Sequence, residues 1–260
     1  MKKRKILDNE TEPNNTAIRK RKFSASDKAL LILAILLLLG AIVLFLWNPV
    51  QNYLRGQKTN EMVSQIEQGV VTVIVDPNAL PVSGEELETF ATTPATTPAE
   101  TEANQTTAVI TATPVPTKYD PAEKLTLTAL GTIKIDKINL QIPLWDGAGI
   151  IPLRYGAGVL ESSARPGQDG NCVILGHRMK AYGSLFNRLA EVAVGDSVVI
   201  TSVDGTQYTY LIDNVIPALL PADLINYIQI DSGTGKQLTL ITCTPTGVGS
   251  HRIVVIGHMA

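Results

Sequence analysis

One uncharged apolar run near the N-terminus constrains this chain more than any other feature of its sequence. Residues 29–47 contain no charged side chain and no proline. As an α-helix with a rise of ~1.5 Å per residue, the run spans roughly 28 Å, close to the ~30 Å hydrocarbon core of a bilayer. We therefore expect residues 29–47 to form a transmembrane signal-anchor helix.

Basic residues gather on the N-terminal side of this run. Residues 1–28 carry nine lysines and arginines, whereas residues 48–77 carry only Arg55 and Lys58. The positive-inside rule then makes residues 1–28 a basic cytoplasmic tail and places the rest of a single-pass cell-membrane protein outside. A cleaved signal peptide is the alternative, although the apolar run is longer than the usual ~7–15 residues. Because the tail sets topology, we expect no nucleic-acid partner.

Composition divides the remaining chain into a tether and a folded domain. The spacing of Met62, Val63 and Ile66 is loosely helical, so the membrane helix is expected to continue briefly as a stalk. Thr, Pro, Ala and Glu then dominate up to about residue 119, and such a segment buries too little apolar surface to offset its ordering entropy. We expect residues 48–120 to form a stalk and disordered linker, and residues 121–260 to form one globular domain.

The folded domain is predicted to be mainly β. Asp204-Gly205 lies between two apolar segments and is a two-residue hairpin signal. Strands are expected at residues 172–175, 197–203, 206–212, 237–242 and 252–257, and short helices at 184–190 and 222–228. Many short strands separated by turn residues favour a closed β-barrel with one or two short helices.

Three reactive side chains lie where an apolar strand is expected to end or begin. They are His177 after Leu175-Gly176, Cys243 after Leu240-Ile241-Thr242, and Arg252 before Ile253-Val254-Val255. If the last two strands are antiparallel neighbours, Arg252 lies across from Cys243. A thiolate can attack an acyl group, an imidazole can protonate a leaving amine, and a guanidinium can hold an oxyanion. These residues are therefore candidate catalytic groups.

Each of these residues also has a structural explanation. An exported domain with two cysteines could be a non-catalytic, wall-associated domain with a Cys172–Cys243 disulfide. Cys172 by itself is more simply a buried hydrophobe, and His251 and His258 are expected to be structural. His177 could equally be a turn histidine and Arg252 a surface strand residue. The spacing of histidines and cysteines indicates no metal site, and we expect no cofactor.

Taken in order, these stretches resemble the sortases, extracytoplasmic cysteine transpeptidases of mainly Gram-positive bacteria. The resemblance covers nearly all of residues 130–257. It includes Gly156-Ala157-Gly158-Val159-Leu160-Glu161-Ser162-Ser163, residues 167–178 ending in Gly176-His177-Arg178, Gly183-Ser184-Leu185-Phe186-Asn187-Arg188-Leu189, Thr239-Leu240-Ile241-Thr242-Cys243 and His251-Arg252-Ile253-Val254-Val255. The resemblance implies a sortase-type β-barrel and moves Cys243 from a disulfide partner to a nucleophile.

The resemblance also implies a reaction. Cys243 would attack the Thr–Gly carbonyl of a Leu-Pro-x-Thr-Gly-like (LPXTG) sorting signal, His177 would protonate the departing glycine amine, and Arg252 would hold the substrate and its oxyanion. Thr242 and Thr244, on either side of the cysteine, are expected to bind substrate. The implied partners are surface proteins or pilins with a C-terminal sorting signal, and an acceptor amine from a peptidoglycan precursor or a pilin lysine.

Subclass and product remain open at the level of sequence. Thr244-Pro245 and the pair His177-Arg178 are similar to class C, the pilin-polymerising group. No Asp-Pro-aromatic lid is found, because Asp76-Pro77 is followed by Asn78, and we expect no second membrane span after the last strand. A class D-like anchoring enzyme is therefore the alternative. A membrane-tethered cysteine protease, which releases its acyl group to water, is a further alternative.

Overall fold

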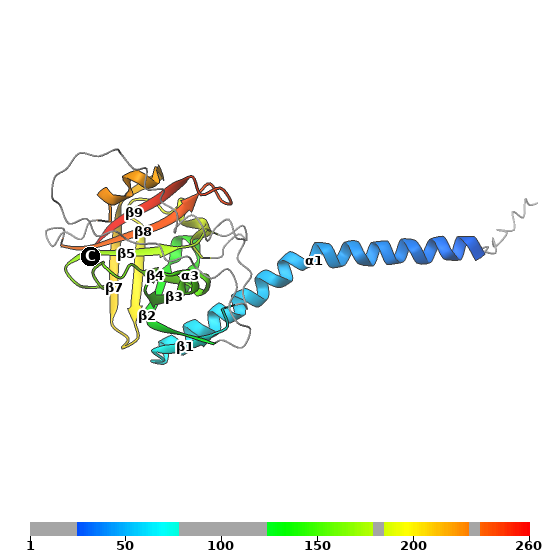
Figure 1. Ribbon diagram of the computed structural model, residues 1–260, viewed down its shortest axis with the longest axis horizontal. Helices are drawn as coiled ribbons and strands as arrows, with labels where there is room; N and C mark the ends of the chain where they lie inside the picture. Colours follow the sequence, from blue (N-terminus) through cyan, green and yellow to red (C-terminus); the bar gives the residue numbers. More distant parts are fainter. Residues whose placement is uncertain (1–24, 78–123, 179–184, 229–234) are drawn as a thin grey trace, which may run out of the picture. The chain divides into compact units, whose positions relative to one another are not determined.

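The computed structural model describes residues 25–77, 124–178, 185–228 and 235–260, and the chain divides into two units, Met1–Val50 and Gln51–Ala260 (Figure 1). In the first unit the described residues belong to helix α1 (Ala25–Glu67). The large apolar side chains between residues 30 and 47 are exposed on this helix. In length and composition, α1 meets the requirements for a helix that crosses a membrane.

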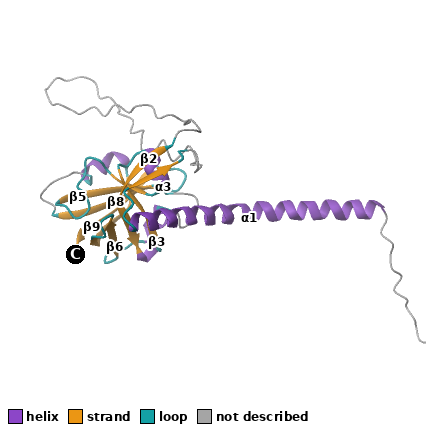
Figure 2. Cartoon of the chain, turned by 90° about the horizontal axis from the view of Figure 1, so that it is seen from below, coloured by secondary structure: helices purple, strands orange, loops and turns teal. Residues whose placement is uncertain are grey.

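The second unit is built around a nine-stranded sheet that closes on itself. The strands are β1 (Thr72–Val75), β2 (Leu125–Ile135), β3 (Leu140–Asp146), β4 (Ala157–Val159), β5 (Gly170–Gly176), β6 (Ser197–Ser202), β7 (Gln207–Leu219), β8 (Lys236–Thr244) and β9 (His251–Met259). Their order is β1-β2-β3-β4-β5-β8-β9-β7-β6, and β6 also pairs with β2. This extra pairing closes β2 to β6 into an eight-stranded barrel, and β1 pairs with β2 outside the ring. Figure 2 shows the strands of the barrel gathered beside the end of α1.

Among the described residues, four short helical segments lie between the strands. They are η1 (Asp136–Ile138), α3 (Ile150–Tyr155), η2 (Phe186–Glu191) and η3 (Pro221–Asn226). The two helices expected at 184–190 and 222–228 correspond to η2 and η3, which are single stretches of 3₁₀ helix. The predicted fold class is confirmed: the domain is mainly β, its barrel is closed, its helices are few and short, and an apolar helix precedes it.

The predicted hairpin is formed by β6 and β7. These strands pair antiparallel from Ser197 with Leu211 to Thr201 with Gln207. Between them Gly205 has a φ of +84°, a left-handed conformation that glycine adopts without steric cost. The backbone N–H of Thr206 donates to Oδ1 of Asp204 at 2.9 Å, which closes the turn. Local turn chemistry therefore determines this pair of strands, as the sequence predicts.

The strands around the site have two apolar faces. Because side chains alternate along a strand, Leu238 and Leu240 of β8 point into the barrel core, and Ile241 points to the outer face. Ile241 joins a second cluster with Val173 of β5 and Val254 of β9. Segments outside the barrel pack on this second cluster, contributing Leu160, Leu224, Tyr227 and Ile228. This outer apolar cluster lies on the face that carries the candidate site.

The N-terminal part of the second unit packs on the barrel. Helix α1 continues to Glu67, and β1 pairs antiparallel with residues 125–128 of β2. Together they bury a separate cluster made of Met62, Ile66, Val73, Val75, Leu127, Ala129, Trp145, Ile151 and Tyr155. The first part of the predicted 48–120 segment is thus packed on the barrel, and residues 78–120 of that segment lie outside the described residues.

Candidate active site

Several strand ends meet at one rim of the barrel, and they carry the three candidate catalytic residues. Strands β8 and β9 are antiparallel neighbours, as expected, and Cys243 is the direct partner of Arg252 in their register. Directly opposed residues on one face have Cβ atoms ~4.5–5.5 Å apart. The pairing therefore places the thiol and the guanidinium side by side on the sheet.

His177 comes to the same place through a parallel pairing. Strands β5 and β8 run side by side, and their ladder ends with Leu175 beside Ile241. One residue further, Oγ1 of Thr242 donates to the carbonyl oxygen of Gly176 at 2.7 Å. Three residues further, Nη1 of Arg178 donates to Oγ1 of Thr244 at 2.7 Å. These two hydrogen bonds join the residues on either side of His177 to the residues on either side of Cys243, so the imidazole and the thiol belong to the same row.

The alternation of side chains assigns this row to the outer face of the sheet. Ile241 belongs to the outer apolar cluster, so Cys243, two residues later, points the same way. Arg252 shares this face with Val254, and His177 continues the alternation of Val173 and Leu175. The three polar residues therefore lie at one end of the outer apolar cluster.

Burial controls the electrostatics of the row. The exposed fractions of His177, Arg252 and Cys243 are 2%, 4% and 9%. Burial, with a smaller contribution from the positive charge of Arg154, lowers the pKa of His177 to about 4. Its imidazole is therefore uncharged at neutral pH and able to accept a proton. A neutral imidazole beside a thiol is in the protonation state that a general base needs.

The Arg252 guanidinium is held by the turn that connects β8 and β9. Its Nη1 donates to the carbonyl oxygen of Gly249 at 2.6 Å and to that of His251 at 3.0 Å. Gly249 has a φ of +63°, and Gly247 in the same turn has a φ of +81°. Glycines in left-handed conformations let this short turn bring the carbonyls toward the guanidinium. The result is a permanent positive charge with a fixed orientation.

The two cysteines occupy different environments. Cys172 belongs to the barrel core, is fully buried, and is a free thiol whose pKa burial raises to about 12. Its partner on β8 is Leu238, five positions before Cys243. Cys243 likewise forms no disulfide, and it points to the opposite face. The Cys172–Cys243 disulfide considered from the sequence is therefore absent from the structure.

The remaining sequence candidates have structural partners. The hydroxyl of Thr242 is fully buried and bonded to Gly176, and that of Thr244 accepts from Arg178. Nδ1 of His251 contacts Oγ of Ser250 at 2.9 Å, and His258 pairs with Asp213 at the opposite end of β9. Of the five proposed site residues, the structure thus brings three into one outward row. It gives the two threonines partners within the protein.

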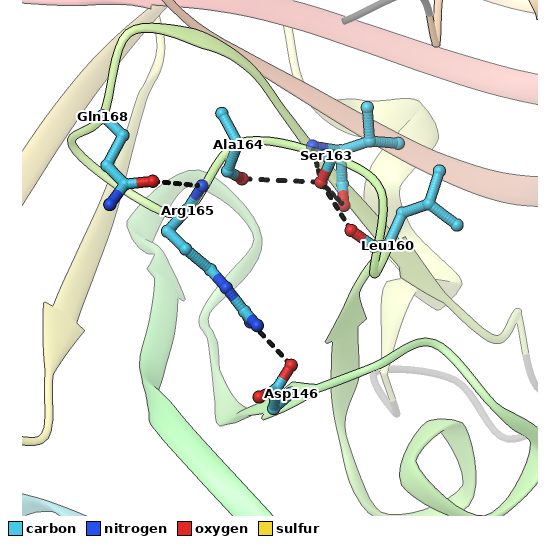
Figure 3. A network of polar contacts seen from close by, with 7 residues as sticks. Asp146, Leu160, Ser163, Ala164, Arg165 and Gln168 are labelled. Atoms are coloured by element: carbon cyan, nitrogen blue, oxygen red, sulfur yellow. Dashed lines mark hydrogen bonds and ion pairs between the residues drawn. The ribbon is translucent and has the colours of Figure 1, made fainter.

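The connection between β4 and β5 is held by a local polar network (Figure 3). Oγ of Ser163 donates to the carbonyl oxygen of Leu160 at 2.8 Å and accepts from the backbone N–H of Val173 at 3.1 Å. Arg165 forms an ion pair with Asp146 of β3 at 2.6 Å. The network fixes Leu160 where it packs on the outer apolar cluster. The backbone N–H of Leu160 also donates to the carbonyl oxygen of Val173 at 2.8 Å, which holds Leu160 against β5.

Sequence reasoning did not find Arg178 or Asn171 as organising residues. Asn171 is 1% exposed, accepts from Oγ1 of Thr239 at 2.8 Å and donates to the carbonyl oxygen of Tyr227 at 2.9 Å. This bond ties the segment after η3 to β5. A buried amide amid an apolar run is the signal that could have identified Asn171, because such a group needs partners.

Known proteins resemble this chain over the barrel. A family model described as the sortase domain matches residues 133–260. Over 135 residues the chain is 32% identical to Sortase A of Streptococcus agalactiae, a match that covers 50% of this chain and 52% of that protein. It is 29% identical over 132 residues to Sortase D of Bacillus subtilis, covering 50% and 63%. The matched region is thus less than two thirds of the length of these curated relatives.

A solved structure is similar over the same part of the chain. It is a lid mutant of Sortase A from Corynebacterium diphtheriae, with 34% sequence identity and a TM-score of 0.47. The match covers 52% of this chain and 71% of that chain.

Proposed function

This chain belongs to the sortase family, and on that premise we propose that it is a membrane-anchored, cell-surface cysteine transpeptidase. One observation carries the proposal. His177, Cys243 and Arg252 lie in one outward-facing row at the rim of the barrel, beside the outer apolar cluster. A nucleophile, a proton carrier and a fixed positive charge are the three groups that acyl transfer through a thioester requires.

In the first half of the reaction, Cys243 acts as the nucleophile. Its thiol proton passes to the neutral imidazole of His177 while the sulfur bonds to the carbonyl carbon of the scissile amide. When the tetrahedral intermediate collapses, the carbon–nitrogen bond breaks and His177 gives the proton to the leaving amine. The enzyme is left as a thioester on Cys243. Because burial lowers the pKa of His177 to about 4, its imidazole is uncharged when the reaction begins.

In the second half, an acceptor amine attacks the thioester. Its nitrogen bonds to the acyl carbon, His177 accepts a proton from that nitrogen, and the carbon–sulfur bond breaks. The proton then returns to the sulfur of Cys243, so one amide has been exchanged for another with no external oxidant or reductant. Water in place of the amine would give hydrolysis, which is the protease alternative.

Arg252 stabilises the negative charge that develops on the carbonyl oxygen. Its guanidinium stays protonated throughout, so it cannot replace His177 as the acid. Its position opposite Cys243 supports this role, since an oxyanion forms within reach of the attacking sulfur. The bonds to Gly249 and His251 orient the guanidinium before substrate arrives. A charge oriented in advance stabilises the developing oxyanion more than a charge that must reorient during the reaction.

We further propose a Leu-Pro-x-Thr-Gly-like sorting signal as substrate, cleaved between Thr and Gly. The outer apolar cluster supports this choice, because the leucine and proline that precede the cleaved bond need an apolar surface. Substrates would be surface proteins or pilins that carry the signal. The acceptor would be an amine of a peptidoglycan precursor or a pilin lysine. Helix α1 would hold the enzyme at the membrane, with the N-terminus in the cytoplasm and the barrel outside.

The test is the fate of the acyl group. The full chain in detergent micelles is incubated with a peptide containing Leu-Pro-Ala-Thr-Gly, with and without an added amine, either triglycine or a lysine peptide. A transpeptidase yields the amide product with at least one of the two amines and releases the glycine fragment in equal amount. Only the hydrolysed acid, at every amine concentration, would instead identify a cysteine protease.

A further inference from the structure

The strand ends that carry His177 and Cys243 are joined by side chains rather than by the backbone ladder. The ladder between β5 and β8 ends at Leu175 and Ile241. Beyond it, one bond runs from Oγ1 of Thr242 to the carbonyl oxygen of Gly176, before the reactive pair. The bond from Arg178 to Thr244, at 2.7 Å, comes after the reactive pair. The second bond therefore closes the frame in which His177 and Cys243 lie side by side on neighbouring strand ends.

Arg178 is held from two sides, which makes it a rigid tie. Its Nη1 reaches Thr244 on β8, and its Nε donates to the carbonyl oxygen of Asn187 in η2 at 3.2 Å. Its backbone forms an isolated antiparallel bridge with Leu185. The N–H of Phe186 also donates to the carbonyl oxygen of His177 at 3.0 Å. The segment that carries the imidazole is thus anchored to η2 and, through one guanidinium, to β8.

Thr244 contributes to this tie from the far side of the sheet. Alternation along β8 places Thr244 on the face opposite Cys243, the face that Thr242 also shares. Its hydroxyl accepts a hydrogen bond from a charged donor, a stronger kind of bond than one between neutral groups. A hydroxyl engaged there is directed away from a peptide bound over the thiol.

We propose that Arg178 and Thr244 are positioning residues: their hydrogen bond sets the separation and alignment of His177 and Cys243 without contacting substrate. The inference rests on the proposed function, because it assigns the two residues a part in the same reaction. It replaces the sequence expectation that Thr244 binds substrate. Reactions between aligned groups are sensitive to such a tie, since a displacement of about 1 Å can cost roughly a hundredfold in rate.

The test compares two substitutions that differ in a single hydroxyl. Thr244→Val keeps the branched shape and removes the acceptor, whereas Thr244→Ser keeps the acceptor. Thr209→Val is the matched control, because Thr209 is an exposed threonine of β7 on the hairpin away from the row. The full chain in micelles is assayed with a fluorogenic Leu-Pro-Ala-Thr-Gly peptide, and thermal unfolding is followed for each variant.

We expect Thr244→Val to lower kcat by about tenfold to a hundredfold with KM within about twofold of the original. Thr244→Ser should recover most of that loss, and Thr209→Val should match the unsubstituted enzyme. A rise in KM with unchanged kcat for Thr244→Val would show direct substrate contact and overturn the proposal. Equal losses in the Val and Ser variants, or no loss in either, would overturn it as well.

A double-mutant cycle checks that the two residues act through one bond. If they do, Arg178→Met combined with Thr244→Val should cost no more than the larger single effect. Losses that multiply would instead assign the residues separate roles. Should either variant fail to fold, Thr244→Ser and Arg178→Lys are compared instead. Arg178→Lys should lower kcat, because an ammonium cannot bond both Thr244 and Asn187 as one planar guanidinium does.

A second readout separates this inference from the proposed function. Alkylation of Cys243 by iodoacetamide is followed against pH, and Cys172 does not interfere because its thiol is buried in the barrel core. Thr244→Val should shift the midpoint of the alkylation profile by about half a pH unit or more, and Thr244→Ser should not. An unsubstituted enzyme that cleaves no peptide refutes the proposed function, while an unshifted alkylation midpoint in Thr244→Val refutes the positioning role.

Discussion

Protonation of His177 should cost the folded barrel a large part of its stability. The side chain is 2% exposed, and its pKa falls from 6.5 to about 4 on folding. A lowered histidine pKa means that the unfolded chain binds the proton more tightly, so stability falls as pH drops from above 6.5 toward 4. With these two values the loss is about 2 kcal/mol at pH 5 and about 3 kcal/mol at pH 4, relative to pH 7.5.

The assay is urea unfolding of residues 51–260, which contain the whole second unit, at pH 7.5, 6, 5 and 4. The same series is run on His177→Gln, whose amide does not titrate, and the difference between the two proteins isolates the histidine. The unsubstituted domain should lose about 2 kcal/mol more than the variant by pH 5. Parallel curves would refute the reasoning. If the unsubstituted domain lost less stability than His177→Gln, the folded state would prefer a charged imidazole, as a thiolate on Cys243 would require. Cys243→Ala would then restore the larger loss in the domain that carries His177.

Two further substitutions test the site and the packing of α1 and β1 on the barrel. Arg252→Lys should lower kcat/KM by about 10²-fold to 10³-fold in the peptide assay, because an ammonium cannot reproduce the oriented planar fork at the oxyanion; activity within threefold of the original would exclude that role. Ile66→Ala should reduce the free energy of unfolding, measured in urea, by about 2–5 kcal/mol, since Ile66 is 1% exposed in the cluster between α1 and β1. Ile74 is 68% exposed, so the control Ile74→Ala should change that free energy by less than about 0.5 kcal/mol. Equal small effects at both isoleucines would show that α1 does not stabilise the barrel.

The part of the site that depends on local chain reversal was predictable from sequence. Pro245, Gly247 and Gly249 between two apolar runs indicate a turn, and the resulting antiparallel pair puts Arg252 opposite Cys243. Strand alternation then fixes the face on which both side chains lie. The hairpin at Asp204-Gly205 was predictable for the same reason. In each case the signal and the contact are separated by only a few residues.

Contacts made across long stretches of chain were beyond the same reasoning. His177 reaches Cys243 through a parallel pairing of β5 with β8, and no spacing in the sequence specifies which strands are parallel neighbours. Strand β1 has only four residues, and its partner β2 begins after a segment rich in threonine and proline, so its place in the sheet had no local signal. Helix α3, with six residues including Pro152, is too short for helical periodicity to appear.

Detection of a thioester on Cys243 is the most direct test of the proposed activity. The full chain is mixed with the Leu-Pro-Ala-Thr-Gly peptide without amine, quenched in acid within seconds, and analysed by intact mass and by mapping of the modified fragment. We expect an added mass equal to the acyl part of the peptide, located on Cys243. This adduct should be absent in Cys243→Ala and retained in Cys172→Ala. Peptide cleavage with no added mass, or an adduct that maps to any residue other than Cys243, would contradict it.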